Sequence, residues 1–361
     1  MTWQLSRFRA GDLVEVRSKE EILATLDQRS CAGGMPFMPE MLQYCGGRFR
    51  VGAVAHKTCD MVGQPGTSRR LQATVHLAGL RCDGVAHDGC EAECNLFWKD
   101  EWLKPASESR SSRVRPATSR KAGAGGCTEA LVLANTRQPS GTDGDEPRYS
   151  CQATQMYEAT QPLVWWDVRQ YVFDVVTGNH SVGRVLRVLY LASLRRLLDH
   201  LPFGYRVVTH FSDWMHQWLS GRPCPSQQPQ IQDGAKTPTG RHLLQSGDYV
   251  RIKMKSEIEK TLNQKYRNRG LTFDCEEMAP YCGRIVKVRK SVTKIIEEHT
   301  GKMLHIKEPC IMLDGVICNS EYARCRLNCP RAIPSYWREI WLERVEEKSA
   351  SKEPVAKRCA E

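Results

Sequence analysis

The chain has 361 residues, of which 41% are hydrophobic and 26% are charged, values that are ordinary for a globular protein with room for two or three domains. It contains no run of about 18 apolar residues and no apolar N-terminal signal segment, which excludes a membrane-spanning helix and favours the cytoplasm. The formal net charge of +11 favours anionic partners.

The first predicted module covers residues 8–104 and opens on an alternating strand after a Gly-Asp turn. Its expected elements, in order, are a strand over 13–17, a short helix over 20–26, and strands over 48–54 and 74–82. Short strands, glycine-rich turns and little helix predict a small barrel, and the Gly-Asp-x-Val opening resembles the first strand of SH3-like barrels. A helix that carries Trp98 and Trp102 is expected to close the module over its core.

The middle of the chain differs in composition from the module before it. Residues 105–150 are rich in Ser, Gly, Pro, Thr and Arg, which predicts a flexible basic linker. A helical insert is expected over 151–219 and a second linker over 220–243. Within the insert, residues 182–201 form a basic amphipathic pattern that Ser181 is expected to cap. Such a helix could lie on an anionic membrane, but we favour packing on the protein itself.

The second predicted module, residues 244–346, repeats the first and precedes a charged tail over 347–361. Residues 10–27 (AGDLVEVRSKEEILATLD) match residues 246–263 (SGDYVRIKMKSEIEKTLN). The match continues through a Tyr-Cys-Gly tripeptide to a paired tryptophan ending, Trp98 and Trp102-Leu103 against Trp337 and Trp341-Leu342. An internal duplication follows, so the expected fold class is α+β, with two SH3-like barrel modules joined by a helical insert.

Four cysteines recur in both copies, out of 16 in the chain. They are Cys45, Cys82, Cys90 and Cys94 in the first copy, and Cys282, Cys318, Cys325 and Cys329 in the second. Without an export signal, metal ligation is favoured over disulfides or free thiols, which are the alternatives. Four thiolates suit zinc or an iron–sulfur cluster, and the sequence does not decide between them.

Further ligand candidates distinguish the copies. The first copy adds Cys59, His76 and His87, and the second adds Cys275, Cys310 and His305. The remaining cysteines, Cys151 among them, are interpreted as small structural side chains because nothing in the sequence pairs them. If one copy carries out chemistry, the extra candidates favour the first.

Several phrases of the chain resemble uncharacterised bacterial proteins with tandem SH3-like, cysteine-rich repeats. They are GDLVEVRS, PFMPEM, the run from Arg81-Cys82-Asp83-Gly84 through Phe97-Trp98-Lys99, and CPRAIPSYWREIWLERVE. The resemblance covers both repeats and part of the middle. It implies a bacterial source and the same tandem architecture, and it implies no particular activity.

Three functions are compatible with these features, and no catalytic residue can be assigned. The favoured hypothesis is a metal-binding interaction or scaffold module that binds a protein or an anionic partner. The first alternative is a metalloenzyme or redox protein of a bacterial biosynthetic pathway, active in the first repeat. The second is a nucleic-acid-binding protein. The chain has no phosphate-binding glycine loop, nucleophile elbow or His-Glu-x-x-His helix, which removes the most easily recognised enzyme classes.

Overall fold

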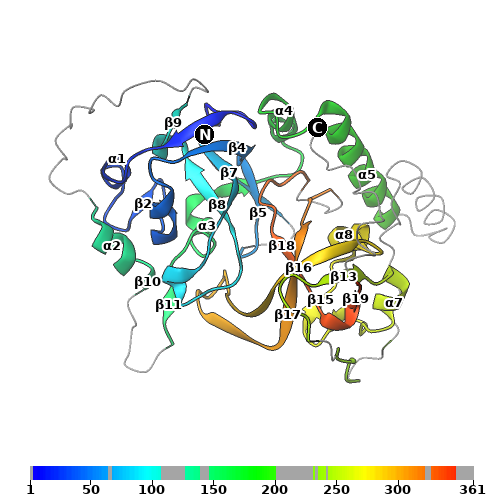
Figure 1. The fold of residues 1–361 in the computed structure, drawn as a ribbon. Helices are drawn as coiled ribbons and strands as arrows, with labels where there is room; N and C mark the ends of the chain where they lie inside the picture. The colour runs from blue at the N-terminus through cyan, green and yellow to red at the C-terminus, as the bar shows by residue number, and fades with distance from the viewer. Residues whose placement is uncertain are drawn as a thin grey trace. The chain divides into compact units, whose positions relative to one another are not determined.

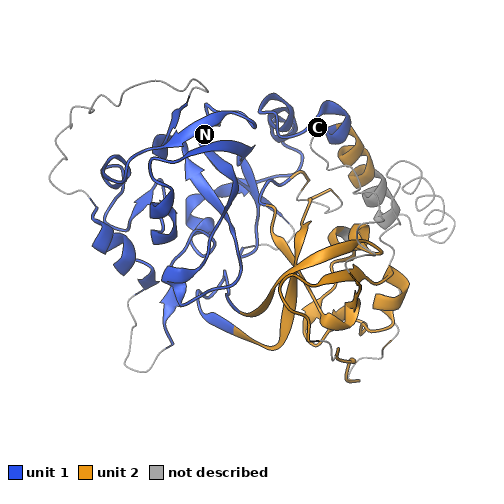
Figure 2. Cartoon of the chain, in the orientation of Figure 1, with its two compact units in different colours: residues 1–185, 294–304, 329–331 blue, residues 186–293, 305–328, 332–361 orange. Residues whose placement is uncertain are grey.

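The computed structural model describes residues 3–63, 67–106, 127–138, 146–200, 231, 235–240, 243–321 and 327–346. The described chain is mostly β-structure with short helices, so the predicted α+β class is confirmed (Figure 1). The chain divides into two compact units (Figure 2). Unit 1 contains residues 1–185, 294–304 and 329–331, and unit 2 contains 186–293, 305–328 and 332–361.

Unit 1 is built on a five-stranded sheet with the strand order β8-β7-β4-β1-β9. The strands are antiparallel to their neighbours and comprise β1 (Leu13–Val16), β4 (Arg48–Val54), β7 (Thr74–Arg81), β8 (Asn95–Lys99) and β9 (Leu103–Pro105). Because side chains alternate along a strand, Val14 and Val16 both lie in the core, as the sequence pattern predicts.

Short elements pack around this sheet. They are α1 (Lys19–Leu23), β2 (Cys31–Ala32), β3 (Met35–Pro36), the 3₁₀ helices η1 (Pro39–Tyr44), η2 (Val85–His87) and η3 (Asp100–Trp102), β5 (Lys57–Cys59), β6 (Ser68–Arg70), α2 (Glu129–Ala134), β10 (Arg137–Gln138), β11 (Arg148–Tyr149), α3 (Met156–Ala159), β12 (Gln161–Leu163) and α4 (Arg169–Val176). The predicted first helix is confirmed as α1. It begins at Ser18, whose hydroxyl accepts a hydrogen bond from the backbone N–H of Glu21. The Glu21 carboxylate in turn accepts a hydrogen bond from the backbone N–H of Ser18.

Unit 2 has a five-stranded sheet of the same connectivity, β18-β17-β16-β13-β19. Its elements are β13 (Tyr249–Ile252), α7 (Lys255–Glu259), β14 (Arg267–Asn268), β15 (Leu271–Thr272), α8 (Cys275–Met278), η4 (Ala279–Tyr281), β16 (Ile285–Ile296), β17 (Met303–Ile317), β18 (Pro334–Trp337), η5 (Glu339–Trp341) and β19 (Leu342–Arg344). The registers also correspond. Val16 lies opposite Leu103 in unit 1, and Ile252 lies opposite Leu342 in unit 2.

The predicted tryptophan helix is wrong in both modules. Trp98 lies in strand β8 and Trp102 in η3, while Trp337 lies in β18 and Trp341 in η5. When a strand runs into one 3₁₀ turn, side chains four residues apart can both face the core, as they do in an α-helix. The four-residue spacing of the tryptophans therefore does not distinguish the two structures. All of these tryptophans are fully buried, as the core interpretation predicts.

Part of the expected linker over 105–150 is ordered. Helix α2 lies within it, and Cys127 and Val132 are buried in the core of unit 1. Residues 107–126 and 139–145 lie outside the described residues, as do most of the second linker and all of the tail.

The predicted amphipathic helix is confirmed as α5 (Val182–His200), and the Ser181 hydroxyl accepts from the backbone of Arg184 at 3.3 Å. The start of the expected insert, residues 151–185, belongs to unit 1. In the part of the chain that is described, no helix has the length and apolar character needed to cross a membrane.

Candidate functional site

The loop of residues 82–94 connects β7 to β8 and carries three of the predicted cysteines. Because these strands are antiparallel neighbours, with Arg81 opposite Asn95, the two ends of the loop lie side by side. The backbone N–H of Cys82 donates to the carbonyl of Cys94 at 2.9 Å. The hairpin therefore places Cys82 next to Cys94 although they are far apart in sequence.

Gly84 allows this loop to turn tightly. Its φ is +70°, and a Cβ added there would lie 2.0 Å from the carbonyl oxygen of Cys90, which no other residue could accommodate without moving the loop. The backbone N–H of Gly84 donates to the sulfur of Cys82, an interaction that favours the thiolate. The close approach also carries Cys90 back toward Cys82.

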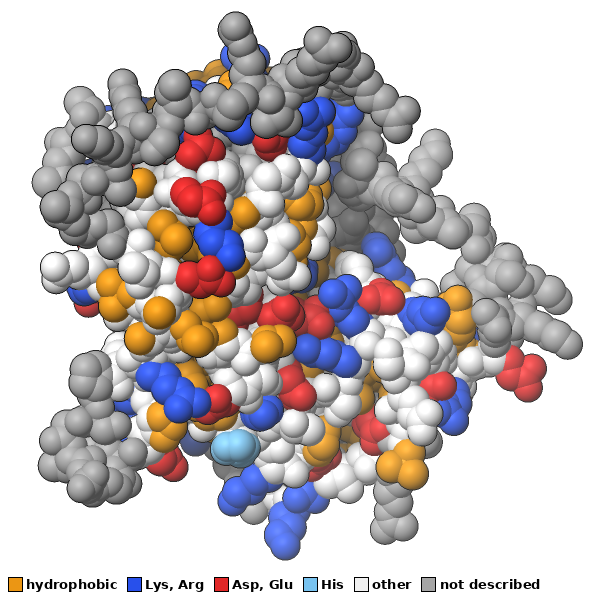
Figure 3. Space-filling view, turned by 60° about the vertical axis from the view of Figure 1, so that its left-hand side comes forward, with side chains coloured by type: hydrophobic (Ala, Val, Ile, Leu, Met, Phe, Trp, Pro, Cys, Tyr) orange, Lys and Arg blue, Asp and Glu red, His pale blue; other side chains and the backbone are white. Residues whose placement is uncertain are grey.

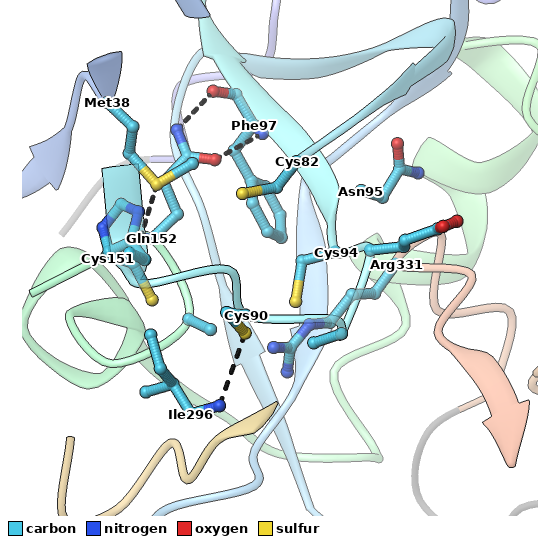
Figure 4. A pocket seen from close by; sticks show the side chains of 14 residues that line it. Met38, Cys82, Cys90, Cys94, Asn95, Phe97, Cys151, Gln152, Ile296 and Arg331 are labelled. Carbon is cyan, nitrogen blue, oxygen red and sulfur yellow. Dashed lines mark hydrogen bonds between the residues drawn. The ribbon is translucent and has the colours of Figure 1, made fainter. Parts of the chain in front are cut away.

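A fourth cysteine, Cys151, joins these three from the middle of the chain. The buried amide of Gln152 pairs with the backbone of Phe97: it accepts from the N–H at 2.8 Å and donates to the carbonyl at 2.8 Å (Figure 4). This pairing fixes Cys151 beside β8. The backbone N–H groups of Ala153 and Thr154 donate to the Cys151 sulfur.

The four thiols line one cavity of about 30 Å³ in unit 1. Figure 4 shows Cys82, Cys90, Cys94 and Cys151 around a common space, and the backbone N–H of Ile296 donates to the Cys90 sulfur at 3.4 Å. A cavity of this size has room for at least one water molecule or ion.

Burial keeps three of these thiols protonated. It raises the pKa of Cys94 to about 12 and that of Cys151 to about 11, and it raises the pKa of Cys82 further still. Neighbouring thiols of the same cavity add to each increase. Thiols with raised pKa values are poor nucleophiles, so in this environment they are unsuited to catalysing thiol–disulfide exchange.

His87 lines the same cavity but has both ring nitrogens engaged. Nδ1 lies 2.6 Å from the buried carboxylate of Glu40, and Nε2 lies 3.0 Å from the carbonyl of Ser150. Burial lowers the pKa of His87, but the hydrogen bond and charge of Glu40 outweigh it and leave the pKa raised. His87 therefore holds the cysteine loop in place and has no nitrogen free to bind a metal.

Glu40 is a site residue that the sequence analysis missed. Its carboxylate also accepts from the backbone of Ala86 at 3.2 Å, and Glu277 of unit 2 likewise accepts from the backbones of Asn319 and Ser320 at 3.0 Å. Glu40 and Glu277 immediately precede the matched pair Met41 and Met278, so the alignment of the two copies could have identified Glu40. Cys151 has no such counterpart, and the comparison of the copies could not identify it.

His76 lies on β7 and does not line the cavity. Its Nδ1 lies 2.9 Å from the carbonyl of Leu96, and burial lowers its pKa to about 4. His76 is therefore neutral at pH 7 and donates its Nδ1 proton to that carbonyl, a structural role.

This burial predicts a loss of stability in mild acid. As the pH falls below about 6.5, His76 takes up a proton in the unfolded chain, but in the folded protein it does so only near pH 4. Between these values wild type should lose about 3 kcal/mol more of its free energy of unfolding than a His76→Gln variant. Urea unfolding at several pH values measures the difference. Parallel pH profiles of the two proteins would contradict the prediction.

The other cysteines predicted for the first copy lie elsewhere in unit 1. Cys45 is half-buried near Lys19 and Glu20, where it ends η1 before Gly46, whose φ is +75°. Cys59 is buried on β5, with its sulfur 3.7 Å from Nη1 of Arg331. Neither residue lines the cavity, so the structure brings together Cys82, Cys90 and Cys94 without them.

The cysteines of the second copy form no corresponding group among the described residues. Cys282 lies beside Cys275, the sulfur of Cys318 lies 3.4 Å from the Ser320 hydroxyl, and Cys310 is buried on β17. Cys329 is buried and belongs to unit 1, and Cys325 lies outside the described residues.

No three His, Cys, Asp or Glu side chains in the described ranges are placed to hold a metal ion as they stand. The chain matches no protein-family model and no curated protein sequence. Its function has to be inferred from its own residues.

Proposed function

We propose that this protein binds a single Zn²⁺ ion through Cys82, Cys90, Cys94 and Cys151, and that the metal stiffens a module acting in interaction or scaffolding. The observation that carries the proposal is the convergence of four thiols on one cavity of about 30 Å³. Four thiolates are a typical ligand set for structural zinc. Such ligands need reduced thiols, and we propose the cytoplasm as the compartment.

The surroundings of the sulfurs support thiolate ligation. Backbone N–H groups of Gly84, Ala153 and Ile296 donate to three different sulfurs, and such bonds stabilise a thiolate and orient it toward a metal. The thiols do not yet form a coordination sphere, so binding requires them to close on the ion as they lose their protons. An iron–sulfur cluster is the alternative occupant of four thiolates, and iron in the elemental analysis would indicate it.

Two alternatives have weaker support. A redox enzyme would use readily ionised thiols, whereas burial raises the pKa of three of the four thiols, Cys82, Cys94 and Cys151. A nucleic-acid-binding protein would present a basic stripe. On the face in Figure 3, basic and acidic side chains of the described residues are interspersed. This face therefore does not present the basic stripe that nucleic-acid binding needs.

We further propose that the two five-stranded sheets descend from one duplicated SH3-like module. Their identical strand order and the corresponding registers around Val16 and Ile252 support this. So does a shared hydrogen bond: Trp102 donates to Thr25 at 3.2 Å, and Trp341 donates to Thr261 at 2.9 Å. Under this proposal the first copy acquired a metal site by recruiting Cys151 from the middle segment.

Elemental analysis of protein purified without oxygen tests the metal site. Wild type is expected to contain about one zinc per chain, and Cys151→Ser is expected to lose it because three thiolates hold the ion less tightly. Cys45→Ser is the matched control and should retain the zinc.

If wild-type protein is folded and reduced but contains no metal, the proposal is contradicted. If Cys45→Ser loses zinc but Cys151→Ser does not, the ligands are the four recurring cysteines, which include Cys45, and not the set that includes Cys151. Removal of zinc by a chelator should also lower the unfolding temperature of wild type, because a ligand that binds only the folded state stabilises it.

A further inference from the structure

The guanidinium side chain of Arg331 is part of the lining of the four-thiol cavity. Arg331 is only 3% exposed, and its Nη2 lies 2.6 Å from the carboxylate of Glu298. Figure 4 shows its guanidinium group directed toward the sulfurs, and its positive charge acts on Cys94. Residues 294–304 and 329–331, which supply Glu298 and Arg331, belong to unit 1 together with the cavity.

Zinc binding changes the charge of this cavity. Cysteine thiols release their protons to solvent as they bind Zn²⁺, and a complex of four thiolates and one Zn²⁺ ion carries two negative charges. Before binding, Arg331 and Glu298 neutralise each other. After binding, the buried region contains two additional negative charges, and buried charge is unfavourable unless a countercharge lies close by.

We propose that Arg331 is the counter-cation of the zinc–thiolate site and that Glu298 competes with the site for its positive charge. This inference rests on the proposed function. Arg331 is a positioning and charge-compensating residue, since no nitrogen of a guanidinium group binds the metal. The two members of one ion pair consequently have opposite effects on metal affinity.

Zinc affinity, measured under nitrogen by competition with a chromophoric chelator, tests the inference. Arg331→Gln should weaken zinc binding about 10- to 100-fold, the range typical of residues that support metal ligands from outside. Arg331→Lys keeps the charge and should retain most of the affinity. Glu298→Gln should bind zinc more tightly than wild type, because the positive charge of Arg331 is then balanced only by the thiolates.

A matched control is Arg338→Gln. Arg338 is also buried, but it lies in unit 2, where it donates to the carbonyls of Asn268 and Arg269 and not to any cysteine. Its loss should destabilise the protein and leave zinc affinity unchanged. Circular dichroism of each variant shows whether it is folded before zinc is added.

The possible outcomes separate the two proposals. If folded wild type binds no zinc, both fail. If wild type binds zinc but Arg331→Gln and Glu298→Gln change the affinity in the same direction, the ion pair has only a structural role and this inference alone is overturned. The same holds if neither variant changes the affinity. Because Arg331→Lys and Glu298→Gln are mild substitutions, the inference can be judged even if Arg331→Gln fails to fold.

Discussion

Replacing Asp174 by alanine is expected to destabilise unit 1 by about 3–5 kcal/mol. Asp174 lies on α4 with none of its side chain exposed, and it accepts from Nζ of Lys57 at 2.6 Å. Lys57 lies on β5 and is 1% exposed. Without Asp174 the ammonium group is left in the core without its carboxylate partner. A buried charge that loses its partner is among the most destabilising consequences of a point mutation.

Urea unfolding of the variant measures this effect, with Glu158→Gln as the control. Glu158 pairs with Arg29, both side chains are more than half exposed, and such surface pairs contribute only about 0–1 kcal/mol. Equal, small losses in the two variants would mean that Lys57 gives up its proton or reaches water. The outcome also shows how firmly the middle segment is held to unit 1, because Asp174 lies in that segment and Lys57 in the first module.

Regular elements were predictable because their sequence signals are local. Strands β1 and β13 follow from alternation that places Val14 and Val250 in the core. The start of α5 follows from Ser181, a residue whose side chain caps the helix within one turn. In each case the residues that decide the structure are neighbours in sequence.

The proposed ligand set was only partly predictable, because cysteines can recur in both copies for reasons other than metal binding. Cys45 and Cys282 recur where each ends a 3₁₀ helix before a glycine of positive φ, and Cys45 lies outside the cavity, so recurrence alone does not identify a ligand. Cys82 and Cys94 are adjacent because they end paired strands. Cys151 reaches them only through the contacts of Gln152 with Phe97, which link distant parts of the chain.

The buried tryptophans provide the last prediction, which compares the modules directly. Trp102 packs edge to face on Phe37 with ring centroids 5.2 Å apart, and Trp341 packs likewise on Phe273 at 5.5 Å. Trp102→Ala and Trp341→Ala should each destabilise their own unit by about 3–5 kcal/mol, because the cavity left in each core cannot fully collapse. Trp166→Ala is the control, since Trp166 is 62% exposed and its loss should cost less than about 0.5 kcal/mol.

Hydrogen exchange resolves the two units and measures each effect separately. Trp102→Ala should accelerate exchange in β1, β4 and β7, and Trp341→Ala should accelerate it in β13, β16 and β17, each by a similar factor. A duplicated module predicts this symmetry because the two tryptophans fill the same position in the same topology.

The proposed zinc site should break this symmetry between the two units. When zinc is bound, unit 1 gains stability that unit 2 lacks, so the effect of Trp102→Ala on exchange should depend on metal and that of Trp341→Ala should not. Equal dependence on metal in both variants would contradict a site confined to unit 1.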